Sequence, residues 1–173
     1  MTLPRPFQIF CLLLCVLTTA SCGYVISSRP DGRSGPAERI FVEPIENQIA
    51  PPRPGLDLDF TDRLKEEMAL DTRFELSGAA SPDVTLRMSL IEFREPALVR
   101  SFDNKQTEVA LEVGARIRVT TREGTREMRV TATDSYVPGL GEARSAGLSR
   151  LWRNLARNTL DQIADRDWVT PSE

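Results

Sequence analysis

Residues 107–120 alternate between apolar and polar side chains more regularly than any other part of the chain. The apolar side chains occupy every second position: Val109, Leu111, Val113, Ala115, Ile117 and Val119. The intervening positions include Glu108, Glu112, Arg116 and Arg118. Because successive side chains of a β-strand point to opposite faces of its sheet, the pattern predicts a long strand that is buried on one face. A sheet with one apolar face needs a second layer to cover it.

The neighbouring segments supply partners for this strand. Residues 122–125 predict a turn, after which Met128, Val130 and Ala132 face inward, so the two strands form an antiparallel hairpin. Residues 83–93 alternate as well, and a slip of phase near Leu90 predicts a bulge or the strand end there. Residues 39–45 predict a first strand that ends close to Pro44.

Two helices are expected to cover the sheet. The first begins near Leu56 and ends near Asp71, with Phe60, Leu64 and Met68 at intervals of four. The second spans about 142–166, and its apolar stripe comprises Leu148, Leu151, Trp152, Leu155, Thr159 and Ile163. The arginines at 150, 153 and 157 lie away from that stripe, and Trp168 is expected to close one end of the core. We therefore predict an α+β fold: a two-layer sandwich of two helices on a four-stranded, mostly antiparallel sheet, in the order β-α-β-β-β-α.

The first 22 residues resemble a bacterial lipoprotein leader. Arg5 precedes an unbroken apolar run from Ile9 to Leu17, which is far shorter than the ~20 residues that span a bilayer. Ala20-Ser21-Cys22 is similar to the end of a lipobox, although Thr19 takes the place of the usual leucine. In that pattern the cysteine thiol receives a diacylglyceryl group, the leader is removed, and the new amine takes an acyl chain such as palmitate. Ordinary secretion that leaves Cys22 free is the alternative.

The leader fixes the predicted organisation of the chain. We expect a signal peptide at 1–21, a lipidated N-terminus and tether at 22–38, an α+β domain at 39–168 and a tail at 169–173. By resemblance to lipoprotein sorting, Gly23 in place of Asp after the cysteine favours the outer membrane, on its periplasmic side.

Composition removes several classes of function. The chain has no histidine, the commonest general base and zinc ligand, and its net charge is −3, or −4 once Arg5 leaves with the leader. The missing histidine disfavours a metal site, and the mild charge disfavours nucleic acid as a partner. We also expect no cofactor, on the motifs considered next.

Three motifs could suggest chemistry, and each has a simpler interpretation. Gly139-Leu140-Gly141 lacks the third glycine of a phosphate-binding loop and more simply starts the last helix. Asp57, Asp59 and Asp62 suit the positive end of the first helix better than acid–base catalysis. Ser135 has no histidine partner.

Basic residues gather around the predicted hairpin: Arg116, Arg118, Arg122, Arg126 and Arg129, with Arg100 and Lys105 in the loop before it. Guanidinium groups bind phosphate in a bidentate manner. We take Arg116, Arg118, Arg129 and Lys105 as candidate contacts for the phosphates of lipopolysaccharide. The alternative is a solvated face of Arg–Glu pairs, since Glu108, Glu112, Glu123 and Glu127 are interspersed.

Four motifs follow one another along the chain: Cys22-Gly23-Tyr24, the run from Ile40 to Asn47, Pro82-Asp83-Val84-Thr85-Leu86, and Asp167-Trp168. In this order they resemble the family of lipopolysaccharide-assembly lipoproteins, LptE. The resemblance implies a non-enzymatic protein that plugs a large outer-membrane β-barrel, LptD, and helps it to deliver lipopolysaccharide to the outer leaflet. Activators of cell-wall synthases and secretin assembly factors have similar first strands and remain alternatives. A lipid-anchored hydrolase is disfavoured because the chain lacks histidine and a nucleophile elbow.

Overall fold

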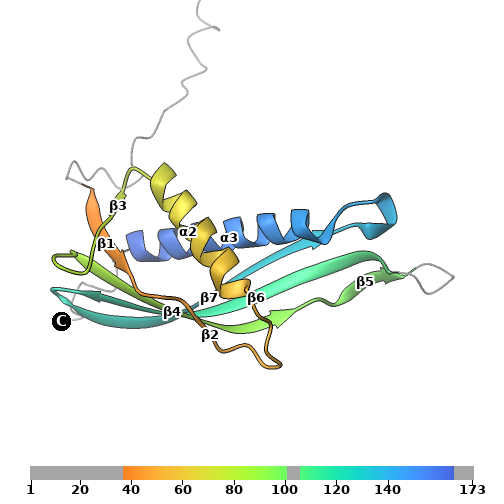
Figure 1. Ribbon diagram of the computed structural model, residues 1–173, viewed down its shortest axis with the longest axis horizontal. Coiled ribbons are helices and arrows are strands. Elements are labelled where there is room, and N and C mark those ends of the chain that lie inside the picture. Colours follow the sequence, from red (N-terminus) through yellow and green to blue (C-terminus); the bar gives the residue numbers. More distant parts are fainter. Residues whose placement is uncertain (1–36, 101–105, 166–173) are drawn as a thin grey trace, which may run out of the picture. The chain divides into compact units, whose positions relative to one another are not determined.

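A computed structural model describes residues 37–100 and 106–165, and in it two helices lie on one face of a mixed β-sheet (Figure 1). The elements in chain order are β1 (Glu38–Val42), β2 (Glu46–Asn47), α2 (Leu56–Leu70), β3 (Phe74–Leu76), β4 (Val84–Arg94), β5 (Ala97–Arg100), β6 (Gln106–Thr121), β7 (Gly124–Tyr136), the 3-10 helix η1 (Pro138–Leu140) and α3 (Arg144–Ala164). The predicted α+β class, with two helices against one sheet, is confirmed.

The predicted hairpin and its neighbour form the antiparallel centre of the sheet. β6 pairs with β7 from Val109↔Tyr136 to Thr121↔Gly124, and on its other side it pairs with β4. The register between β4 and β6 shifts between Leu90 and Glu92, so the predicted bulge is confirmed. This shift returns Phe93 to the buried face of the sheet.

The predicted count of four strands is wrong, because the sheet that the described residues form has seven. β1 runs parallel to both β3 and β4, and β2 also runs parallel to β4. When the chain leaves a sheet through a helix and re-enters it from the same end, the new strand runs in the same direction as the old one. The crossover through α2 therefore explains why the strands before and after this helix are parallel. The three additional strands, β2, β3 and β5, have only two to four residues each and are too short to show a clear alternation.

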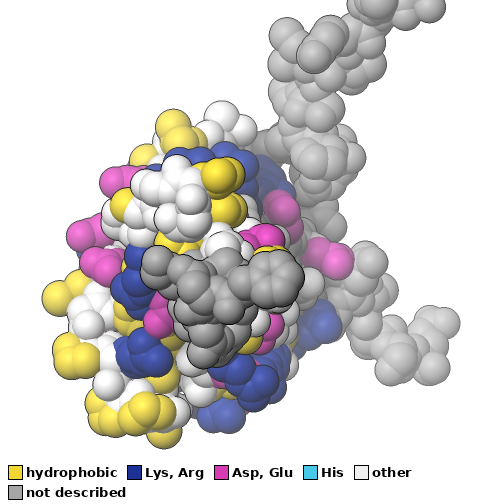
Figure 2. Space-filling view, turned by 90° about the vertical axis from the view of Figure 1, so that its right-hand side faces the viewer, with side chains coloured by type: hydrophobic (Ala, Val, Ile, Leu, Met, Phe, Trp, Pro, Cys, Tyr) yellow, Lys and Arg dark blue, Asp and Glu magenta, His cyan; other side chains and the backbone are white. Residues whose placement is uncertain are grey.

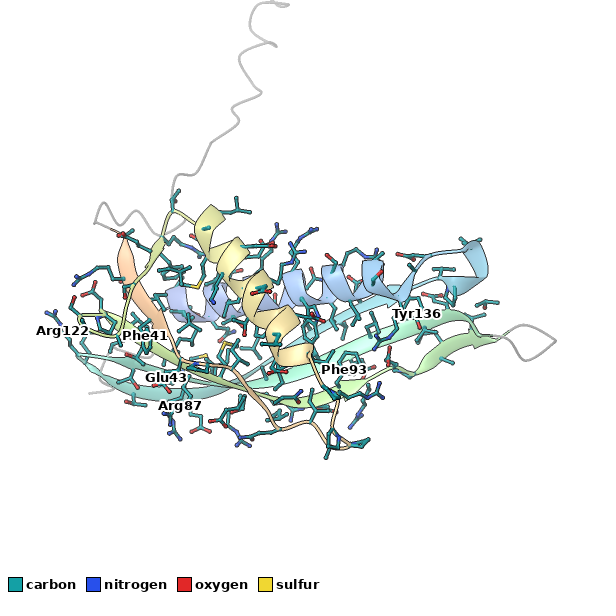
Figure 3. All side chains as sticks on the ribbon, viewed as in Figure 1. Phe41, Glu43, Arg87, Phe93, Arg122 and Tyr136 are labelled. Carbon is teal, nitrogen blue, oxygen red and sulfur yellow. The ribbon has the colours of Figure 1, made fainter. Side chains whose placement is uncertain are left out.

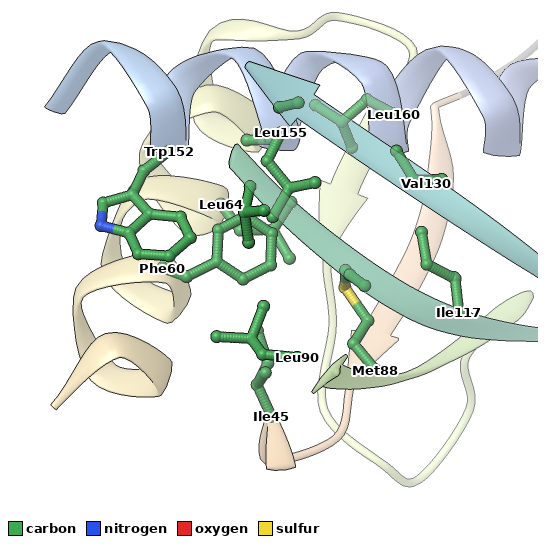
Figure 4. Packing of buried hydrophobic residues seen from close by; sticks show 14 of the residues in the cluster. Ile45, Phe60, Leu64, Met88, Leu90, Ile117, Val130, Trp152, Leu155 and Leu160 are labelled. Carbon is green, nitrogen blue, oxygen red and sulfur yellow. The ribbon is translucent and has the colours of Figure 1, made fainter. Parts of the chain in front are cut away.

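The core lies between the sheet and the helices. All six apolar side chains of β6 that the alternation selects are at most 3% exposed. From α2, Phe60, Leu64 and Met68 meet them. Trp152 of α3 is 3% exposed and lies beside Phe60, with ring centroids 5.6 Å apart (Figure 4). Its predicted place in the core is confirmed.

The arginines of α3 lie beside the apolar stripe but do not simply face solvent. Arg153 and Arg157 both reach Glu67 of α2, a carboxylate that is only 7% exposed, at 3.4 and 3.0 Å. A buried carboxylate needs partners of opposite charge. These ion pairs therefore hold the two helices to each other.

Side chains of α3 also cover the outer edge of β7. Arg150 Nη2 donates to the carbonyl of Ser135 at 2.6 Å, Asn154 Nδ2 to that of Thr133 at 3.4 Å, and Asn158 Nδ2 to that of Thr131 at 2.9 Å. The three donors are four residues apart along α3, a rise of ~6 Å, and the three acceptors are two residues apart along β7, a rise of ~6.7 Å. The spacing of the donors therefore matches that of the acceptors over this length. Carbonyl groups that are satisfied in this way are less available to pair with a strand of another chain.

Loss of one of these donors tests the protection of the edge. We expect Asn158→Leu to lower the free energy of unfolding by about 1 kcal/mol, the net value of one hydrogen bond, and to promote self-association through β7. Urea unfolding and light scattering measure the two effects. Gln162→Leu places the same side chain on an exposed position of the same helix and should do neither. Equal behaviour of the two variants would contradict the protective role.

No helix within the described residues is long and apolar enough to cross a membrane. The predicted leader, the tail and Trp168 lie outside these residues, as does the tether except for residues 37 and 38. Glu38 already belongs to β1. The remaining domain limits stay predictions.

Candidate functional site: the arginine face of the sheet

The face of the sheet that the helices leave uncovered carries a group of arginines. Arg116 and Arg118 of β6 point to this side because the alternate residues of β6 fill the core. Arg129 of β7 lies directly opposite Arg116, and Arg87 of β4 lies directly opposite Arg118. We call these four residues the arginine face. In Figure 3, Arg87 lies on the side of the sheet away from both helices.

Cross-strand arginine pairs repel each other, and glutamates on neighbouring strands offset that repulsion. Glu127 of β7 serves both Arg118, at 3.0 Å, and Arg116, at 3.4 Å. Glu43 lies 2.6 Å from Arg87, and their hydrogen bond raises the pKa of that guanidinium. The face is therefore a mosaic of both charges rather than a purely basic patch, as the alternative interpretation of the sequence expects.

Gly114 of β6 makes room for the ion pair of the fourth arginine, Arg129. Arg129 forms an ion pair with Glu92 of β4, although β6 lies between their strands. A Cβ atom on Gly114 would lie 3.3 Å from Arg129 Nη2 and 3.4 Å from Glu92 Cβ. The missing side chain thus lets the arginine cross the middle strand.

Two shallow hollows open on this face, and both are lined by Arg87 and Arg118. The first hollow also includes Glu46, Ser89, Arg116 and Glu127. Each guanidinium has five N–H donors, and the ion pairs described here use only some of them. The remaining donors could hold a phosphate oxygen in a bidentate manner.

The structure does not bring every predicted basic residue to this face. Arg122 lies at the hairpin turn, 3.8 Å from Asp83, and Arg126 lies opposite Val119 and so belongs to the helix side of the sheet. Arg100 is the last residue of β5 rather than a loop residue. Lys105 and Cys22 fall outside the described residues.

Arg87 is the functional candidate that the sequence did not reveal. It occupies an outward position between Leu86 and Met88, and that much is visible in the alternation of residues 84–90. Its place beside Arg118 depends on the register between β4 and β6, which the sequence does not specify.

The other motifs have structural roles. Gly139 lies in η1 against Thr107, Gly141 closes η1 with a φ of +80°, and α3 starts only at Arg144, so these glycines do not begin the helix directly. Asp57 and Asp59 lie in the first turn of α2, as predicted, whereas Asp62 lies beyond it. Among residues 37–100 and 106–165, no group of three histidine, cysteine, aspartate or glutamate side chains could hold a metal ion.

A second arginine cluster joins the N-terminus of α3 to the sheet. Glu95 receives Arg53 Nη1 at 2.9 Å and Arg144 Nε at 2.6 Å. Both guanidinium groups also lie over the ring of Phe93, at 5.5 and 5.9 Å from its centroid. The hydrogen bond from Arg144 is the main reason that the pKa of Glu95 lies below its usual value.

The lowered pKa of Glu95 predicts a dependence of stability on pH. The stabilisation is complete above the unfolded-state pKa of about 4.3 and is lost as the pH falls through the lower folded-state pKa. We expect Glu95→Gln to destabilise the protein at pH 7, and the deficit should shrink as the pH falls below about 4. Urea unfolding from pH 7 to 3 measures this. Glu75→Gln, at an exposed position, is the control, and a deficit that does not change with pH would contradict the assignment.

Comparison with known proteins gives a family match. A family model described as lipopolysaccharide-assembly, LptE, matches residues 37–166, which is three quarters of the chain. None of the curated proteins matches the chain.

Several solved structures are similar to the chain. A hypothetical protein of Chlamydia trachomatis is 9% identical, covers 73% of this chain and 95% of its own, and has a TM-score of 0.52. A minor lipoprotein of Acinetobacter baumannii is 21% identical over 75% of this chain and 94% of its own, with a TM-score of 0.47. The rare lipoprotein B of Shewanella oneidensis is 13% identical over 72% and 96%, with a TM-score of 0.46. At this level of identity, the first of these shows the fold alone.

Proposed function

Because the chain belongs to the LptE family of lipopolysaccharide assembly, we propose that it is the plug and assembly partner of an LptD-like outer-membrane β-barrel. The family match over residues 37–166 is the observation that carries this proposal. In this role the protein contributes a binding surface and no catalysis. The barrel inserts lipopolysaccharide into the outer leaflet, and the plug supports its folding and occupies its lumen.

The chemistry of the arginine face supports a plug. Wide membrane barrels have polar interiors, so a protein inside one must present a polar surface. The arginine face meets this requirement because its cations alternate with glutamates. In the end view of Figure 2, Lys and Arg side chains likewise lie among Asp and Glu side chains rather than in one patch.

Affinity purification of the full chain from membranes tests the partnership. We expect a large outer-membrane β-barrel to be recovered with it, along with lipopolysaccharide. Recovery of a cell-wall synthase or of a secretin in place of the barrel would contradict the proposal and favour one of the two alternatives.

We also propose that Cys22 carries the lipid anchor and holds the protein on the periplasmic side of the outer membrane. Two or three acyl chains at ~0.8 kcal/mol per buried methylene would anchor the protein firmly. Mass spectrometry of the mature N-terminal peptide should show an acylated Cys22. An unmodified thiol, or a mature chain that begins elsewhere, would exclude the anchor.

The arginine face is the proposed contact for lipopolysaccharide phosphates, with Lys105 as a further candidate. Arg116 and Arg118 are about half exposed and share one counter-charge, Glu127. A phosphate between them would add the second negative charge that the two guanidinium groups lack. Arg87 and Arg129 border the same surface.

Charge reversal tests this contact. We expect Arg116→Glu with Arg118→Glu to weaken lipopolysaccharide binding by at least about tenfold, which corresponds to ~1.4 kcal/mol. Stability should change little, because exposed ion pairs contribute only ~0–1 kcal/mol each.

Lys65→Glu with Arg122→Glu is the matched control, since it makes the same change of charge on exposed positions away from the arginine face. Binding that both pairs weaken equally would point to net charge alone. Unchanged binding in the first pair would eliminate the arginine contact.

A further inference from the structure

A row of apolar side chains on the helix side of the sheet loses its cover at β3. Val84 of β4, Ile40 of β1 and Leu76 of β3 are paired in register across three neighbouring strands. Val84 is 1% exposed and Ile40 is fully buried, but Leu76 is 42% exposed. Burial therefore stops at β3, which is the last strand on this side of the sheet among the described residues.

The end of α2 adds to this exposed apolar surface. Leu70 is the last residue of α2 and is 77% exposed, and β3 begins four residues later, at Phe74. In Figure 1 the end of α2 lies beside β3 at the edge of the sheet. We call Leu70 and Leu76 the β3-edge patch.

The backbone of β3 also has a free outer side. Alternate residues of a strand direct their N–H and C=O groups to the same neighbour. Arg73 O accepts the amide of Glu38 at 3.0 Å, and two steps beyond Glu75 the amide of Ser77 meets a carbonyl of β1 at 2.8 Å. Leu76 therefore directs its N–H and C=O away from β1, to the side where no strand of the described part of the chain lies. The opposite edge of the sheet, β7, has side chains of α3 over its carbonyl groups.

The end of α3 is held close to this free edge. Arg73, the residue before β3, joins Asp161 in the last turn of α3 at 2.9 Å and Asp71 at 2.7 Å. The helix ends at Ala164, so the chain leaves the described structure near the start of β3. The eight residues 166–173 can span roughly 27 Å when extended, and the three residues of β3 cover only ~10 Å. The C-terminal segment is therefore long enough to run along all of β3.

The residues of this segment suit the patch. Trp168, Val169 and Thr170 are of types that favour strands, and Trp168 has a large apolar surface to bury. A separate protein would need an interface of about 1,000 Å² to bind stably, which two leucines do not supply. A segment of the same chain is already present at a high effective concentration, so a small patch can hold it.

We propose that the C-terminal segment docks on the β3-edge patch, with Trp168 over Leu70 and Leu76 and with its backbone paired to Leu76. This assigns a place to the tryptophan that is expected from the sequence to close one end of the core. The paired segment would cover the second edge of the sheet, as the side chains of α3 cover β7, and so keep β3 from pairing with a second copy of the chain.

Tryptophan fluorescence tests the contact on the full chain purified in detergent. The chain has two tryptophans, so the difference between its spectrum and that of Trp168→Phe isolates the emission of Trp168. We expect Leu70→Asp with Leu76→Asp to shift this emission to longer wavelength and to increase its quenching by acrylamide. Leu98→Asp with Leu140→Asp, the same change on exposed leucines at the β5 end of the sheet, should do neither. An emission that the first pair leaves in place, or that both pairs shift equally, would overturn the proposal.

Hydrogen exchange tests the pairing of the backbone. The amide of Leu76 should exchange at least about tenfold more slowly in the full chain than in a chain that ends after Asp165. Amides in the centre of β6 should exchange equally in both chains, which shows that the shorter chain is folded. Equal exchange at Leu76 would overturn the pairing. Protection of Leu76 that rises with protein concentration would assign the edge to a second copy and overturn the proposal as well.

Discussion

The rest of the fold depends on β6, which carries apolar side chains on one face and charged side chains on the other. One face of this strand buries its six apolar side chains, which obliges α2 and α3 to lie on that side. The other face carries arginines that cannot be buried without cost, so it stays uncovered. β4 and β7 take their registers from β6, and the arginine face exists because these registers place Arg87 and Arg129 beside Arg118 and Arg116.

Arginine–carboxylate clusters join several elements of the fold outside the apolar core. The chain has twenty arginines and two lysines among its 22 basic residues. A planar guanidinium with several donors can bridge two elements, whereas an ammonium acts as a point charge. Arg73 joins the end of α2 to α3 through Asp71 and Asp161, and Arg150 joins α3 to Asp134 of β7 and to Glu142. The sequence places Arg150 on a helix, away from the apolar stripe, but in the fold it joins α3 to the neighbouring elements.

The periodicity of the sequence predicts individual strands and helices, but it does not predict how distant segments pair. The alternation of residues 107–120 and 83–93 places β6 and β4, and the spacing from Leu56 to Met68 places α2. Parallel pairing of β1 with β3 and β4 is absent from the prediction because direction is set by the crossover through α2 and not by the strand itself. Similarly, the prediction finds Arg116, Arg118 and Arg129 on one hairpin, whereas Arg87 joins them only through pairing between distant segments. Arg126 lies on the helix side of the sheet and not on the arginine face, because successive residues of a strand point to opposite sides.

The charges of the arginine face are unevenly balanced. Arg87 pairs with Glu43, but Arg116 and Arg118 share Glu127, and Glu92 serves both Arg129 and the neighbouring Arg94. In these ion pairs the guanidinium groups therefore outnumber the carboxylates, so the face keeps a surplus of positive charge although glutamates are interspersed. Exposed charges are screened beyond a Debye length of ~8 Å, so a phosphate held at this face would be recognised at short range, through the planar arrangement of the guanidinium donors.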